Sequence, residues 1–130
     1  MNLEELWELV QQGSDEQAQA LGVERFDPRA LVVVDAWLAE RSEPLDEDEL
    51  ARLGLFLGRL LLDTHGGGLT VIDAPGHPLH GEWAATGFTR GLGEDFHVPF
   101  IVSAARIGGQ RSLSAAAWYE QLLREGARPA

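Results

Sequence analysis

The feature that most constrains this chain is an apolar stretch from Leu50 to Leu62, LARLGLFLGRLLL. Its charged residues are Arg52 and Arg59, so apolar side chains cover most of the circumference of a helix of this length, and such a helix has to be covered on several sides. Gly54 and Gly58 lie four residues apart on one side, where their missing side chains let another backbone come close. The stretch predicts a core helix of a soluble domain.

Acidic residues precede this helix, and glycines follow it. Helix starts favour carboxylates because of their exposed amides and the helix dipole. The run Gly66-Gly67-Gly68 ends the helix, and Leu69–Asp73 has the composition of a β-strand. The carboxylates at the helix start are Asp46, Glu47, Asp48 and Glu49.

The first 25 residues predict two short helices. Asn2 begins the first, which we expect to end at Gly13, and Ser14 begins the second, over residues 15–21. Each start has a Glu or Gln three residues later, which is the spacing of a capping box. The thin apolar face of the second helix makes residues 1–25 a candidate N-terminal appendage.

A longer helix is predicted next. Asp27-Pro28 is a helix-start signal, because Asp accepts free amides and Pro suits the first helical position. We expect this helix to continue to about Arg41. The β-branched run at 32–34 lowers helix propensity and leaves a strand over residues 30–34 as an alternative.

A hairpin is predicted after the glycine run. Residues 74–77, Ala-Pro-Gly-His, have Pro and Gly in the two central positions of a type II turn. The partner strand comes from 79–83 or from 83–89, and the register stays open. Phe96–Val98 predicts a third strand.

The C-terminal part predicts two helices. Pro99 starts one that runs through Ile107 and stops at Gly108-Gly109. Ser112 is the predicted cap of the last helix, and the tail at 126–130 is expected to fray.

These elements predict an α+β fold, in which N-terminal helices pack on a small antiparallel sheet and two C-terminal helices follow. The chain has 130 residues, of which 45% are hydrophobic, and four Trp. A chain of this length buries a sizeable core without metals or disulfides. With no repeat or linker in the sequence, we expect one domain over 1–130.

The net charge of −11 is concentrated in the first part of the chain. Residues 1–50 hold fourteen of the twenty-one acidic residues and three of the ten arginines, which gives −11, and residues 51–130 hold seven of each sign. Nucleic-acid binding is disfavoured, because it requires a basic patch. An anionic membrane would repel the chain as well. A basic protein would be steered toward the acidic N-terminal part.

The sequence contains no cysteine and shows no recognisable targeting signal. The absence of cysteine removes disulfides, thiolate nucleophiles and Cys-ligated zinc. The N-terminus is acidic where a signal peptide needs positive charge, and the longest apolar run is too short to span a bilayer. A cytoplasmic location is the simplest expectation.

The four histidines all fall in predicted turns or strand ends. Imidazole and carboxylate are zinc ligands, so His77, His80 and Glu82, completed by His97 or His65, form a candidate metal or small-molecule site. Their spacing matches no motif with a defined mechanism, and the sequence predicts no cofactor. His65 with the glycines after it resembles the oxyanion segment of lipases, but no G-x-S-x-G accompanies it.

The order of motifs carries one resemblance. LGLFLG, then GGGLTVID, then Val98-Pro99-Phe100 and Ser112-Leu113 at two helix starts, resembles small bacterial proteins of uncharacterised function. Those proteins pair a glycine-containing helix with a following hairpin, so the resemblance implies a fold and no activity. It covers about residues 28–123.

Two hypotheses for function follow. The first is a non-enzymatic interaction protein, such as an accessory or immunity-type factor, whose acidic helical face binds a basic protein or which forms a homodimer. Its candidate contact residues are the four acids at the start of the core helix. The second is a small-molecule or metal-dependent site, or an enzyme, at the histidine-bearing hairpin.

Overall fold

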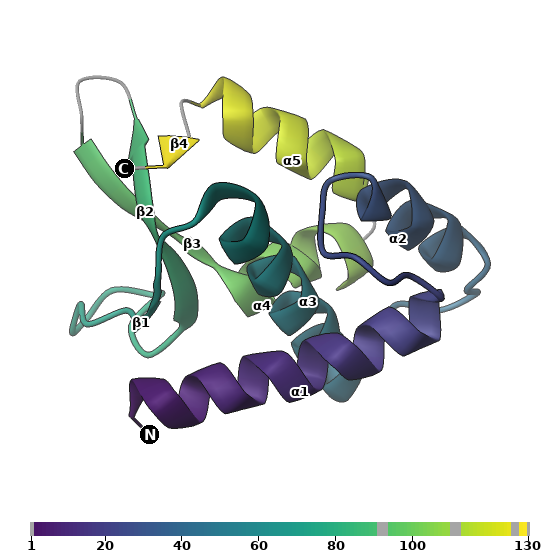
Figure 1. Cartoon of the computed structure of the whole chain (residues 1–130), viewed down its shortest axis with the longest axis horizontal. Helices are drawn as coiled ribbons and strands as arrows, with labels where there is room; N and C mark the ends of the chain where they lie inside the picture. Colours follow the sequence, from purple (N-terminus) through teal and green to yellow (C-terminus); the bar gives the residue numbers. More distant parts are fainter. Residues whose placement is uncertain (1, 91–93, 110–112, 126–127, 130) are drawn as a thin grey trace.

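The computed structural model describes residues 2–90, 94–109, 113–125 and 128–129 (Figure 1). The first half forms three helices, α1 (Leu3–Leu21), α2 (Ala30–Ala39) and α3 (Glu47–His65). An antiparallel sheet follows, made of β1 (Leu69–Val71), β2 (Trp83–Arg90) and β3 (Glu94–Pro99). The chain continues through α4 (Phe100–Ala104), a π-helical turn η1 (Ala105–Gly109), α5 (Ala115–Arg124) and a two-residue strand β4 (Arg128–Pro129). The predicted α+β fold is confirmed.

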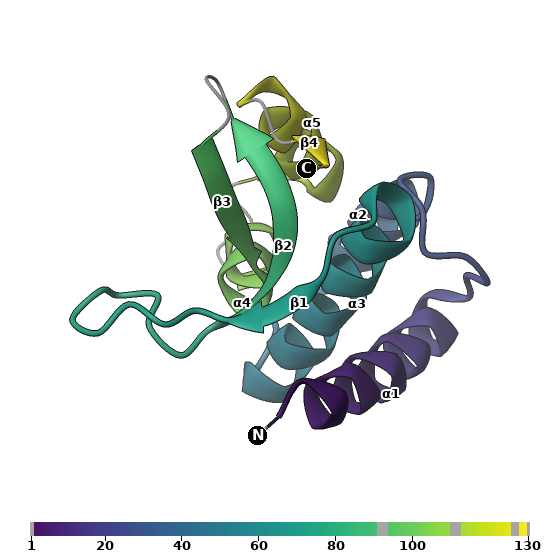
Figure 2. The same ribbon diagram turned by 60° about the vertical axis from the view of Figure 1, so that its left-hand side comes forward.

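The central helix is α3. Leu53, Phe56 and Leu60 on it are fully buried. α1 packs along one side of α3, while α4 and the sheet lie on the other (Figure 2). The prediction that this helix is covered on several sides is confirmed.

The two glycines of α3 face α4. A Cβ on Gly54 would lie 2.9 Å from the backbone oxygen of Phe100, and a Cβ on Gly58 would lie 2.5 Å from the Phe100 ring. Gly54 therefore admits a backbone and Gly58 admits an aromatic ring. This close approach is the structural reason for two poor helix formers in the core helix.

The predicted break at Gly13 is wrong, because α1 is one helix of 19 residues. Gly13 is buried where α1 crosses α3, and a Cβ there would lie 2.4 Å from Cδ1 of Leu55. Ser14 does not cap a second helix, since its hydroxyl donates to the carbonyl of Gln11 at 3.1 Å. Leu6 and Val10 have no exposed surface, so α1 contributes to the core.

α2 begins two residues later than Asp27-Pro28 predicts, and the alternative strand over 30–34 is wrong. The Asp27 carboxylate accepts from the amide of Arg29 at 2.9 Å, in a turn that precedes the helix. Farther along α2, Asp35 accepts from the amides of Ala115 at 2.6 Å and Ala116 at 3.2 Å, and so ties α2 to the start of α5.

The cap of α5 is Ser114, whose hydroxyl accepts from the amide of Ala117 at 3.0 Å. Leu113 precedes the helix. Ser112, the predicted cap, lies outside the described residues. Arg128–Pro129 pairs with β2 as β4, although the sequence predicts a frayed tail at 126–130.

The hairpin uses the second of the two predicted partner segments. β1 pairs with the start of β2, with Leu69 opposite Ala85 and Val71 opposite Trp83. The turn at 74–77 has a positive φ at Gly76 and a 2.9 Å hydrogen bond from the amide of His77 to the carbonyl of Ala74. These are features of the predicted type II turn.

A bulge in β2 separates its two pairing registers. The register shifts between Ala85 and Phe88, so both side chains are buried although they are three residues apart. At the bulge, Gly67 and Gly87 both have positive φ, and a Cβ on Gly87 would lie 2.7 Å from Cα of Gly67. The glycine run therefore ends α3 and also lets the chain cross β2 closely.

Candidate interaction grooves

The predicted acidic residues begin α3, and two of them are used by the helix itself. The Asp46 carboxylate accepts from the amide of Glu49 at 2.8 Å, and the Glu49 carboxylate accepts from the amide of Asp46 at 3.1 Å, which completes a capping box. Glu49 also forms an ion pair with Arg41, and its side chain is 17% exposed. Glu47 and Asp48 are exposed. In the described structure, Glu47 and Asp48 neither complete the capping box nor pair with Arg41. Of the four predicted contact residues, these two therefore face solvent without serving the helix start.

Asp48 lines a groove between α1 and α3 of about 340 Å³, which we call the acidic groove. Its apolar floor comes from three elements, with Leu9 on α1, Leu55 on α3 and Trp83 at the start of β2. The groove is lined by Leu9, Gln12, Gly13, Glu16, Asp48, Ala51, Arg52, Leu55 and Trp83.

The charges of the acidic groove are two carboxylates and one guanidinium. Glu16 and Asp48 are exposed, and Arg52 is half-buried. Within the described structure, these three side chains form no ion pair with one another. The groove therefore keeps a net negative charge that is open to solvent.

A second groove lies toward the N-terminus of α1, where that helix meets the end of α3 and the start of β1. It has a volume of about 360 Å³, and we call it the apolar groove. Leu3 and Trp7, which line this groove, are 58% and 36% exposed. The groove is lined by Leu3, Trp7, Leu62, Asp63, Gly67, Gly68 and Leu69.

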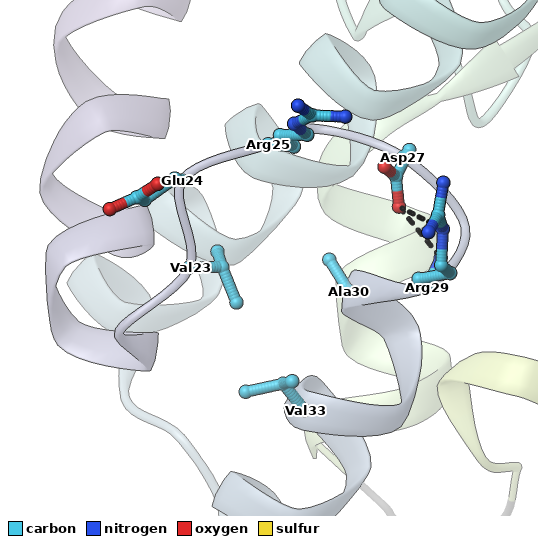
Figure 3. Close-up of a pocket in the computed structure, with 7 residues that line it drawn as sticks. All are labelled: Val23, Glu24, Arg25, Asp27, Arg29, Ala30 and Val33. Atoms are coloured by element: carbon cyan, nitrogen blue, oxygen red, sulfur yellow. Dashed lines mark hydrogen bonds and ion pairs between the residues drawn. The ribbon is translucent and has the colours of Figure 1, made fainter.

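A hollow at the start of α2 holds no converging set of polar groups (Figure 3). Its floor is apolar, made by Val23, Ala30 and Val33. Arg29 turns toward Asp27, with a 3.9 Å ion pair, while the remaining charged side chains point away from the floor in Figure 3. The hollow is lined by Val23, Glu24, Arg25, Asp27, Arg29, Ala30 and Val33.

The hairpin histidines bond to the backbone of their own turn. Nδ1 of His77 accepts from the amide of Leu79, and Nδ1 of His80 accepts from the amide of Ala74, each at 3.0 Å. His97 lies on β3, where its exposed side chain borders a small cavity beside α4 and α5. Among the described residues, no three His, Asp or Glu side chains form a group that could hold a metal ion.

Glu82 and His65 have separate surroundings. Glu82 lies just before β2, where its backbone closes the hairpin with Ile72. His65, at the end of α3, has its Nε2 2.6 Å from the hydroxyl of Tyr119 on α5, and its ring contacts the edge of Phe88. Burial lowers the pKa of His65 and raises the pKa of Tyr119, so both are neutral at pH 7.

Comparisons of this chain with protein-family models, with curated proteins and with solved structures give no match. No helix in the described part of the chain is long and apolar enough to cross a membrane.

Sequence reasoning found Asp48 but missed the groove around it. Glu16, Leu9 and Trp83 come from segments that the sequence treats as separate, and they meet because α1 continues through Gly13. The helical spacing of Leu6, Val10 and Ala18, with no Pro between them, is a signal that could have predicted the longer helix.

Proposed function

We propose that this protein is a non-enzymatic binding protein, and that its acidic groove receives a lysine or arginine side chain from a basic protein partner. The observation that carries this proposal is that two exposed carboxylates, Glu16 and Asp48, line the same groove as the apolar side chain of Trp83. A basic side chain needs both features, because its stem is apolar and its head is charged.

The residues that line the groove support this choice of ligand. The aliphatic stem of a lysine or arginine would lie over Leu9 and Leu55, its cation would contact Glu16 and Asp48, and the Trp83 ring adds cation–π attraction. The net charge of −11 steers a basic partner toward the acidic half of the chain.

The charge of the groove also bears on self-association. A homodimer formed through this groove would bring two copies of the same net-negative surface together, which opposes association. The proposed partner is therefore a different chain.

The test uses a labelled peptide of leucine and lysine, about 14 residues long, which would reach about 20 Å as a helix and about 45 Å when extended. Fluorescence anisotropy measures its dissociation constant. We expect the double variant Glu16→Lys, Asp48→Lys to bind at least about tenfold more weakly, because two attractions of up to about 1 kcal/mol each become repulsions. Raising the salt concentration should weaken wild-type binding.

The matched control is the double variant Asp95→Lys, Glu120→Lys, which changes the net charge equally at exposed positions on β3 and α5. It should weaken binding by less than about threefold, because only the general field of the protein changes. Equal losses in the two double variants would contradict a specific acidic groove.

A further inference from the structure

We infer that the apolar groove is a second docking surface for the same partner and receives a bulky apolar side chain next to the partner's basic residues. This inference rests on the proposed function, since it assigns both grooves to one occupant. The occupant is an amphipathic basic segment of another protein.

The rim of the apolar groove has the chemistry of an interface anchor. Leu3 and Trp7 are one helical turn apart on α1, and both expose a large part of their apolar surface. Leu62 from α3 and Leu69 from β1 line the same groove. An exposed tryptophan at a concave surface is typical of the residues that dominate binding energy in protein interfaces.

The apolar groove is held in shape before any partner binds. The guanidinium of Arg59 lies 5.5 Å from the centre of the Trp7 ring and pairs with Asp63 at 3.2 Å. Gly67 and Gly68 line the groove without side chains, and the carbonyl of Gly68 accepts from the amide of Thr86 at 2.8 Å. A preformed groove loses little conformational entropy on binding.

Charge complementarity identifies the occupant as basic. α1 carries five carboxylates and no basic residue. Its helical spacing places Leu3 and Trp7 on one flank and Leu9 and Glu16 on the other, with Glu8 on the outer face between them. A segment that fills both grooves therefore passes over the acidic outer face of α1, and it has to span about 20 Å along the helix from Leu3 to Glu16 as well as the width of the helix, about 10 Å.

The experiment repeats the anisotropy titration of the leucine–lysine peptide with Leu3→Ser and with Trp7→Ala. Each should weaken binding by about tenfold, because the anchor loses its apolar contact. A second peptide, with serine at each leucine position, should bind wild type more weakly and should show no further loss with Leu3→Ser.

The matched control is Val32→Ser, which removes an apolar side chain that is 67% exposed on α2. It should leave the dissociation constant unchanged.

If Leu3→Ser and Trp7→Ala bind as wild type while Glu16→Lys, Asp48→Lys loses binding, the apolar groove is not a docking surface and the proposed function survives. If Leu3→Ser weakens binding while the charge reversal does not, the apolar groove binds the peptide, but the proposed function fails and with it the assignment of both grooves to one basic partner. Equal effects of Leu3→Ser and Val32→Ser would overturn the inference.

Discussion

Several segments of this chain pack closely because a glycine at the contact has no side chain. Gly54 meets the backbone of Phe100, whereas Gly13 meets the end of the Leu55 side chain. The difference matters, because a side chain can rotate away from an added methyl group and a packed backbone cannot.

Gly54→Ala is expected to lower the free energy of unfolding by about 1–3 kcal/mol, although alanine is the better helix former by about 1 kcal/mol. Gly13→Ala should cost less, because only Cδ1 of Leu55 has to move far. Urea unfolding of both variants measures the two values. A Gly54→Ala protein as stable as wild type would show that α3 and α4 do not pack as described.

Between elements, the hydrogen bond of His65 with Tyr119 joins the end of α3 to α5 beside β2. A histidine with a pKa lowered by burial is protonated first in the unfolded state, so the free energy of unfolding falls as the pH drops below the ordinary value of 6.5. A tyrosine with a raised pKa is ionised first in the unfolded state, so the free energy of unfolding falls as the pH rises above 10.0. The contact between His65 and Tyr119 is therefore most stabilising between pH 6.5 and pH 10.0.

Substitutions of His65 and of Tyr119 separate the contributions of the two side chains to the pH dependence of stability. His65→Gln should reduce the loss of stability on the acidic side, and Tyr119→Phe should reduce it on the alkaline side and cost about 1 kcal/mol at pH 7.5. Urea unfolding at several pH values gives the slopes. An acidic slope that His65→Gln fails to reduce would refute the assignment.

The elements that the sequence predicts well carry their signals locally. The start of α3 follows from Asp46 and Glu49 three residues apart, and the turn at Pro75-Gly76 follows from its two central residues. Gly13 was misassigned as a helix end because its burial depends on Leu55, which is far away in the sequence. The bulge of β2 and the strand β4 likewise arise from pairing between distant segments.

In the candidate grooves, too, the sequence predicts residues with local signals but not contacts between distant segments. Asp48 could be proposed from the sequence because the acids are consecutive there, but two of the four predicted residues proved to serve the helix start. The exposure of Leu3 and Trp7 could not be predicted, because helical spacing places them near the core face of α1. The end of α3 and the start of β1 determine how much of them stays open.

At the scale of the whole molecule, α1 lies along one side and α5 along the other, with α3 between them (Figure 1). Both grooves border α1, whereas the exposed control positions on β3 and α5 lie elsewhere on the surface. A protein that attracted cations only through its charge would bind them at any exposed carboxylate of the acidic half, including Glu4 and Glu5 in the first turn of α1 and Glu47 on α3. Binding through the grooves would be confined to the residues that line them.

The most direct measurement is therefore a map of amide chemical-shift changes when the leucine–lysine peptide is added to the full chain labelled with nitrogen-15. We predict that the largest changes occur at Trp7 and Glu16 on α1, at Asp48 on α3 and at the Gly67-Gly68 pair. Residues of α5 should change little. Changes centred on α5 or β3, or spread evenly over the exposed residues, would contradict the account.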